Sequence, residues 1–293
     1  MQVREFDHSN MQTKHTIHTG LVDGWYKTWS GAYSNKKFHS SIHTASSAPP
    51  MMPVNTDPNS RIDPGTVDSF DETMFEDFCE LSILERISKK TITMMELGAG
   101  AGNQSIDVSA MVKWRLCDTQ VESVQCYAVE AEATHFRWLQ ENFKFNDLSG
   151  HTIFGAMSDE LTWMPFDNKR PPADSYGQAL GCPGMHVPVF TVDYFVDLFE
   201  LECIDILHMD VQGEESKVIS GCAKSIEAGK IDYIIECPHT LEIGEDIKKK
   251  LDPYYDCIVD MPTWSGLHNL GLTKPVNIPQ DGLQFFVRKE LNV

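Results

Sequence analysis

Three glycines stand at alternate positions, Gly98, Gly100 and Gly102, directly after an apolar run, and an acidic residue, Glu96, comes just before them. Glycines let a backbone approach a ligand closely, and the free N–H groups of a following helix can bind it. The turn reads E-L-G-A-G-A-G, whereas dinucleotide-binding turns read G-x-G-x-x-G. The best dinucleotide register has Ser105 where the third glycine would stand, so the pattern favours another ligand.

A second acidic residue narrows the class of ligand. Glu130 ends the next apolar run, in "CYAVEAEATHF", where a carboxylate can accept both ribose hydroxyls of an adenosine. Glu96 would repel a pyrophosphate but can face a cation. Either acid alone is typical of a helix cap, but the two together across one βαβ unit predict a site for S-adenosylmethionine, which carries an ammonium, a sulfonium and no phosphate.

If the acceptor of a methyl group from S-adenosylmethionine is a hydroxyl, the protein must align that hydroxyl and remove its proton, which requires a base near the acceptor. The candidates are His208 and Asp210 in "ILHMD", and Glu236 and His239 in "ECPHT". His208 is expected deeper in the sheet, as a core histidine, and Asp210 is equally consistent with a base or a helix cap. Asp210, Glu236 and His239 would also suit a divalent cation, which we do not expect the enzyme to need.

Apolar runs alternate with helical stretches along most of the chain. Strands are predicted at 92–97, 124–129, 151–156, 204–209, 231–235, 255–260 and 283–288. Helices are predicted at 103–115, 132–146, 214–227 and 243–251, and an earlier helix begins near Thr66 or Asp68. This alternation predicts an α/β fold, a mostly parallel sheet with helices on both faces.

With these elements in place, a family resemblance can be stated. The segments "MELGAGAGNQS", "YAVEAEATHFRWLQENFKFN", "GAMSDE", "IDILHMDVQGEESKVISG" and "DYIIECPHT" resemble the FkbM-type S-adenosylmethionine-dependent methyltransferases over residues 90–240. The resemblance implies the class I methyltransferase fold, which is Rossmann-like, with seven strands of which the last-placed is antiparallel. It also implies O-methylation of a hydroxyl on a secondary metabolite or sugar-like molecule.

The family pattern can be carried over position by position. It implies that the methionine side of the cofactor is contacted by Glu96, Gly98, Ala99, Gly100 and Gly102, to which we add Ser105. It places Glu130 and Ala131 at the ribose, Ser158 and Asp159 at the adenine, and Asp210 beside the methyl donor. These positions follow the carboxyl ends of strands, where open α/β sheets generally bind ligands.

Composition limits the partners and the compartment. The formal net charge of −19 repels phosphate backbones, which makes a nucleic-acid substrate improbable and favours a small molecule. No apolar run is long enough to span a membrane or to act as a signal peptide, and the eight cysteines show no C-x-x-C pair. We therefore expect a cytoplasmic protein with reduced thiols.

Two domains of unequal character are expected. Residues 1–65 form an extension with an aromatic stretch, "GWYKTWSGAYSNKKF", for which an active-site lid and a packing contact are equally consistent; residues 66–293 form the methyltransferase domain. The connections 157–203 and 261–282 are long enough to be binding loops, and their aromatic residues are candidates for an acceptor pocket: Trp163, Phe166, Tyr176 and Trp264. The alternatives to O-methylation are N-methylation and a binding module without activity.

Overall fold

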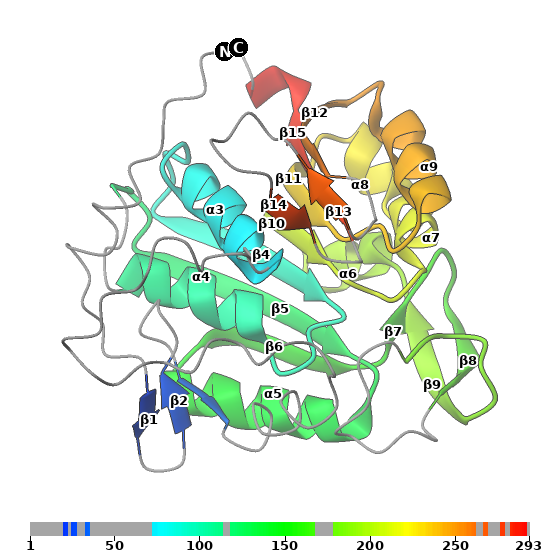
Figure 1. Cartoon of the computed structure of the whole chain (residues 1–293), viewed down its shortest axis with the longest axis horizontal. Helices are drawn as coiled ribbons and strands as arrows, with labels where there is room; N and C mark the ends of the chain where they lie inside the picture. Colours follow the sequence, from blue (N-terminus) through cyan, green and yellow to red (C-terminus); the bar gives the residue numbers. More distant parts are fainter. Residues whose placement is uncertain are drawn as a thin grey trace.

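A seven-stranded sheet forms the centre of the molecule (Figure 1). The computed structural model describes residues 20–22, 25–27, 33–35, 72–113, 118–167, 178–261, 266–268, 276–278 and 282–291; the short strands within 20–35 and 266–278 are described as backbone only. The strand order is β12-β15-β11-β10-β4-β5-β6. The strand bounds are β4 Thr91–Leu97, β5 Ser123–Glu130, β6 Ser149–Phe154, β10 Ile204–Met209, β11 Ile231–Glu236, β12 Tyr255–Met261 and β15 Leu283–Arg288.

Pairing within the sheet confirms the predicted fold class. Strands β11, β10, β4, β5 and β6 pair in parallel, while β15 pairs antiparallel with both β11 and β12. The last strand of the chain is thus inserted between two earlier ones, as expected for a class I methyltransferase. Every residue of β10 and β11 is buried, which explains why both are mostly apolar on both faces, with Asp205, His208, Asp232 and Glu236 as buried exceptions.

Helices cover both faces of the sheet. Their bounds are α3 Glu72–Leu84, α4 Asn103–Lys113, α5 Ala133–Asn146, α6 Val192–Leu198, α7 Glu215–Ser220, α8 Ala223–Glu227 and α9 Leu241–Leu251, and a 3₁₀ turn, η2, covers Lys289–Leu291. One hydrophobic core packs α3, α4 and α5 on one face, and a second packs α6 to α9 on the other. No helix among the described residues is long and apolar enough to cross a membrane.

Side-chain caps begin the two helices that follow site loops. Glu132 accepts hydrogen bonds from the N–H groups of Thr134 and His135 at the start of α5. Thr240 accepts one from the N–H of Ile243 at the start of α9. Such caps satisfy N–H groups that have no partner within the helix, so they fix where each helix begins after its strand.

The connection 157–203 differs from the long loop that we expected. It contains β8 Thr162–Phe166 and β9 Met185–Phe190, which pair antiparallel, and β9 also pairs with β7 Ala156–Met157. The prolines in "TWMPF" and "MHVPVF" conceal both strands in the sequence. The missed helix α6 follows at Val192–Leu198, so the described part of this connection is mostly regular structure.

Two further predictions need correction. The helix predicted at 214–227 is broken at Gly221 and Cys222 into α7 and α8, and the Gly221 backbone packs so closely on Ser158 that an added side chain would lie 2.4 Å from its carbonyl oxygen. The strand predicted at 151–156 ends at Phe154, since Gly155, with φ of +156°, turns the chain toward β9.

The extension lies largely outside the described residues, as do Thr66, Asp68 and the aromatic candidates Tyr176 and Trp264. Its described parts are β1 Gly20–Val22, β2 Trp25–Lys27 and β3 Tyr33–Asn35, which form a small antiparallel sheet. β3 lies beside α5, and Figure 1 draws this sheet at the other end of α5 from β7, β8 and β9. A short antiparallel pair, β13 Gly266–His268 and β14 Val276–Ile278, lies within the connection 261–282.

Candidate active site

A cavity opens at the carboxyl ends of β4, β5, β6 and β10. Its wall consists of Gly98, Gly100, Glu130, Ala131, Glu132, His135, Gly155, Ala156, Met157, Phe166, Gln178, Leu180, Asp210, Val211 and Gln212. Neighbouring strands of the sheet each contribute the residues that follow their last position. The cavity is therefore where the sequence placed the ligand, at the carboxyl edge of the sheet.

The three glycines of the turn have different tasks. All have positive φ, +74° at Gly98, +55° at Gly100 and +84° at Gly102. A side chain at Gly98 would lie 1.8 Å from the carbonyl oxygen of Asp210, and one at Gly102 would lie 2.5 Å from Leu139. At Gly100 an added carbon would meet no described atom within 4 Å. Two glycines thus allow close packing inside the protein, and Gly100 keeps the cavity open.

Glu96 and Ser105 lie behind this turn. The carboxylate of Glu96 accepts hydrogen bonds from the backbone N–H groups of Gln104 and Ser105, at 3.1 and 2.9 Å, and from the Ser105 hydroxyl. Glu96 thereby caps α4, the alternative that applies to any acid at a strand end. Neither residue is in the cavity wall, nor are Ala99 and Gly102, so their part in cofactor binding stays a prediction.

Glu130 does reach the cavity. Its carboxylate accepts hydrogen bonds from the N–H of Gly100, at 2.7 Å, and from the N–H of Glu132. Burial raises the pKa of Glu130 to about 7, although these hydrogen bonds favour the ionised form. Ala131 borders the cavity beside it. The carboxylate therefore ties the glycine turn to the end of β5 and remains at the cavity wall.

Ser158 and Asp159 are the predicted adenine contacts, and that role stays a prediction. The Ser158 hydroxyl donates to the carboxylate of Glu214 at 2.8 Å, and Asp159 is exposed. Neither is in the cavity wall, where Gly155, Ala156 and Met157 lie instead. The early end of β6 accounts for the difference, because the chain bends inward before residue 158.

His208 is a core residue, as its depth in the strand predicted. Its Nε2 lies 3.4 Å from Oε1 of Glu76, a buried residue of α3. Glu76 also accepts hydrogen bonds from the Cys237 thiol and the Gln104 side-chain amide. Burial lowers the pKa of His208, but the neighbouring Glu76 and Glu96 raise it more. This cluster joins α3 to the sheet and does not line the cavity.

The structure brings Asp210 and His239 together and adds Glu215. The imidazole Nε2 of His239 lies 3.3 Å from Oδ1 of Asp210, and its Nδ1 lies 2.9 Å from Oε1 of Glu215. The carbonyl oxygen of Cys237 is 2.8 Å from the same Nδ1, which indicates that this nitrogen carries the proton. His239 has a φ of +57°, an uncommon value outside glycine that marks a constrained position.

Glu236 does not complete that group, although the sequence made it a candidate. It is fully buried at the end of β11, and both carboxylate oxygens have no hydrogen-bond partner among the described residues. Burial and the nearby Glu215 raise the pKa of Glu236 well above its ordinary value. Glu215 takes its place beside His239; the signal in the sequence was the short "DVQGEES" spacing to Asp210, which we interpreted only as a helix start.

A cation could be held only with difficulty at this group. Asp210, Glu215 and His239 place one ligand atom each within 4.8 Å of one another. Glu215, however, already accepts hydrogen bonds from the N–H groups of Val211 and Gly213 as well as facing Nδ1 of His239. This arrangement orients an imidazole more readily than it coordinates a metal ion.

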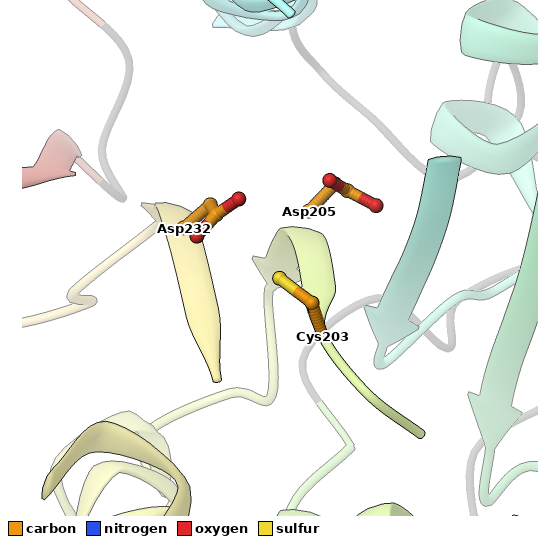
Figure 2. A group of neighbouring side chains, drawn as sticks. All are labelled: Cys203, Asp205 and Asp232. Carbon is orange, nitrogen blue, oxygen red and sulfur yellow. The ribbon is translucent and has the colours of Figure 1, made fainter. Parts of the chain in front are cut away.

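A second acidic group lies at the amino ends of the strands, away from the cavity. Cys203, Asp205 and Asp232 come from the amino ends of β10 and β11 (Figure 2). Lys89 contacts both carboxylates, at 2.5 Å for Asp205 and 3.5 Å for Asp232, and Arg288 contacts Asp232 at 2.9 Å. Burial and the two aspartates raise the pKa of Cys203 to about 12. The thiol is therefore protonated, and two cations already balance the two acids.

Comparison with known proteins agrees with this fold and site. Residues 181–254 match the model of the methyltransferase FkbM domain, which covers the loops that carry Asp210, Glu215 and His239. No sequence among the curated proteins matches the chain.

Solved structures of several methyltransferases are similar to this chain at low sequence identity. A precorrin-6y C5,15-methyltransferase from Geobacter metallireducens GS-15 has 11% identity and a TM-score of 0.42, over 77% of this chain and 95% of that one. An O-methyltransferase from Bacillus cereus, in complex with S-adenosylhomocysteine, has 11% identity and a TM-score of 0.41, over 76% and 84%. A ribosomal protein L11 methylase from Lactobacillus delbrueckii subsp. bulgaricus has 12% identity and a TM-score of 0.35, over 72% and 77%.

These distant likenesses concern the fold and leave the acceptor of this chain open. The family match, in contrast, covers loops that border the cavity. It confirms the resemblance found in the sequence: with a methyltransferase FkbM domain match over residues 181–254, the chain is an S-adenosylmethionine-dependent methyltransferase.

Proposed function

We propose that the enzyme methylates a hydroxyl group of a small secondary-metabolite or sugar-like molecule, with Asp210 as the catalytic base. The observation that carries the proposal is the order Asp210, His239, Glu215, which runs from the cavity wall into the protein. Asp210 is 36% exposed at its side chain, whereas Glu215 is fully buried. One carboxylate therefore meets the acceptor, and the other fixes the imidazole behind it.

The residues of the cavity wall fit the cofactor. Glu130 would hold the ribose, Gly100 would allow close approach of the methionine part, and Ala156 and Met157 would flank the adenine. S-adenosylmethionine supplies a methyl group that its sulfonium has activated. The acidic wall suits this cationic cofactor, since Glu130, Glu132 and Asp210 all border the cavity.

Asp210 needs only modest basicity for this reaction. The proton of a hydroxyl becomes much more acidic as its oxygen gains the methyl group, so a carboxylate in contact with it suffices. The side-chain amide of Gln212 donates to Oδ1 of Asp210 at 3.0 Å, and Nε2 of His239 lies on the same oxygen. The Gln212 amide orients the carboxylate. Because the ring proton of His239 is on Nδ1, its Nε2 can donate to Asp210 only when both ring nitrogens are protonated, and in that form His239 is a positioning residue.

Charge supports a small acceptor over a nucleic acid. The net charge of −19 and the acids of the cavity wall disfavour a polyanion. We keep residues 1–65 in the proposal as an active-site lid.

Transfer of label from the methyl donor tests this function. The full chain is incubated with methyl-labelled S-adenosylmethionine and a metabolite extract, beside Asp210→Asn, which keeps the size of the side chain. We expect a labelled small molecule whose methyl group is bonded to oxygen, and a strong loss of label with the variant. Label on nitrogen, on RNA or on protein would refute the acceptor class, and cofactor binding without transfer would favour an inactive binding module.

A further inference from the structure

The side chain of Gln178 is buried in the cavity wall without a partner. It is 5% exposed, and neither its amide nitrogen nor its amide oxygen has a hydrogen-bond partner within the described part of the chain. Buried side-chain amides in proteins are almost always hydrogen-bonded, because an unpaired one reduces stability. Gln178 is part of the cavity wall, so a ligand bound there is within reach of its side chain and could satisfy the amide.

Backbone pairing fixes where this amide lies. Gln178 comes just before Leu180, which pairs with Phe166 at the end of β8. The N–H of Asp167 donates to the carbonyl oxygen of Ala179 at 3.3 Å, and the N–H of Gly181 donates to that of Pro165 at 2.9 Å. The three residues that follow Gln178 are thus held to the β8 strand, which fixes the backbone beside Gln178.

The place of Gln178 along the carboxyl ends of the strands indicates which part of the cofactor would lie beside it. The strand order β10, β4, β5, β6 places Asp210, Gly98, Glu130 and Gly155 in that sequence along the cavity. If Glu130 binds the ribose and the methyl group is near Asp210, the base must extend toward β6 and beyond. Gln178 lies on that side, two residues before Leu180, which forms a bridge to the end of β8 in the sheet of β7, β9 and β8.

The surroundings of Gln178 fit a nucleobase. Ala156, Phe166 and Leu180 belong to one small apolar cluster, and Met157 lies next to it in the cavity wall. A flat apolar slot with a single amide suits an aromatic ring that has polar groups on one edge. Adenine offers an amino donor beside a ring-nitrogen acceptor, and a glutamine amide is complementary to that pair.

We infer that Gln178 recognises the adenine edge of the cofactor, its amide oxygen accepting from the 6-amino group and its amide nitrogen donating to the adjacent ring nitrogen. Gln178 is then a specificity residue for the nucleobase, supplied by the hairpin after β6. The inference rests on the proposed placement of the cofactor in this cavity.

Calorimetry with a pair of ligands tests the inference on the full chain. The ligands are S-adenosylhomocysteine and its analogue with hydrogen in place of the 6-amino group. We expect the unmodified enzyme to bind the first about tenfold to hundredfold more tightly than the analogue. Gln178→Leu should bind S-adenosylhomocysteine more weakly by a similar factor and lose the preference. The control Gln140→Leu, an exposed glutamine on α5, should retain both.

The outcomes separate this inference from the proposed function. If the enzyme and Gln178→Leu bind S-adenosylhomocysteine equally well, the cofactor site stands and the role of Gln178 is wrong. If the enzyme itself does not bind S-adenosylhomocysteine, both are wrong. Gln178→Ala gives the same comparison without an added apolar side chain, and the thermal midpoint of each ligand-free variant shows that it is folded.

Discussion

The two ends of β10 and β11 carry acidic groups of similar composition and opposite character. At the amino ends, Lys89 and Arg288 contact the buried carboxylates of Asp205 and Asp232. At the carboxyl ends, Asp210 and Glu215 share a single imidazole, that of His239, and Asp210 borders the cavity. The same two strands thus have one electrically balanced end and one end with excess negative charge.

This difference separates a structural cluster from a candidate site. Asp205 also accepts a hydrogen bond from the N–H of Thr93 on β4, so the amino-end cluster joins neighbouring strands. A cation ligand there would have to displace Lys89, whereas the cavity end can attract a cationic cofactor. The number of acids in a cluster is therefore less informative than the charges that already neutralise them.

The largest effect is expected at the cavity end. Asp210→Asn should lower the rate of methyl transfer by about 100-fold to 10,000-fold, because a positioned base contributes that much to proton transfer. Binding of S-adenosylhomocysteine should change only a few-fold, since the amide keeps the shape of the side chain. Initial rates and calorimetry give both values. A variant that transfers methyl groups at the full rate would remove Asp210 from the chemistry.

At the amino end, the effect should be on stability alone. Asp205→Ala leaves the N–H of Thr93 and the ammonium of Lys89 without their acceptor, and should cost about 2 kcal/mol of unfolding free energy. This value is below that of a fully buried pair because Lys89 is 47% exposed. Urea unfolding measures it, with Glu122→Ala, from the exposed pair with Lys90, as the control. Unchanged stability with lost cofactor binding would contradict the comparison.

The glycine turn and the strands could be predicted because their signals are local. β10 and β15 have the predicted bounds, and Gly100 and Glu130 border the cavity. Glu215 and Gln178 were missed because their roles depend on contacts between separate segments. Glu215 needs the loop of His239, and Gln178 needs a hairpin whose strands contain prolines.

The pH dependence of cofactor binding should report on Glu130. Ribose hydroxyls donate to an ionised carboxylate, and the pKa of Glu130 is raised to about 7 by burial. Affinity for S-adenosylhomocysteine should therefore be highest above pH 7 and fall by about tenfold in total as the pH drops below 7 and Glu130 becomes protonated. Glu130→Gln should bind about tenfold more weakly above pH 7 and show no such slope. A flat profile for the unmodified enzyme would exclude Glu130 from the ribose site.

The contribution of Glu130 to the stability of the ligand-free protein should change with pH in the direction opposite to its contribution to cofactor affinity. Because the pKa of Glu130 is raised from 4.5 to about 7, its stabilising contribution is fully present below 4.5 and is lost as the pH rises through about 7. The difference in unfolding free energy between the unmodified protein and Glu130→Gln isolates this contribution from those of other buried acids.

The smallest effect is expected from chelation. Glu215 is occupied by backbone N–H groups and His239, and Lys89 occupies the other acidic group. Treatment with EDTA should therefore leave the rate of methyl transfer unchanged. Loss of activity that Mg²⁺ or Mn²⁺ restores would show that one of the two clusters holds a cation after all.

Calorimetric titration of the full chain with S-adenosylhomocysteine, run beside Gly100→Val, tests the central claim most directly. Gly100 has a φ of +55° and open space before it, so valine there should fold with the rest of the domain but obstruct the ligand. We predict binding of one ligand per chain for the unmodified protein and none for a folded variant. Equal affinity in both proteins would place the cofactor elsewhere and contradict the account.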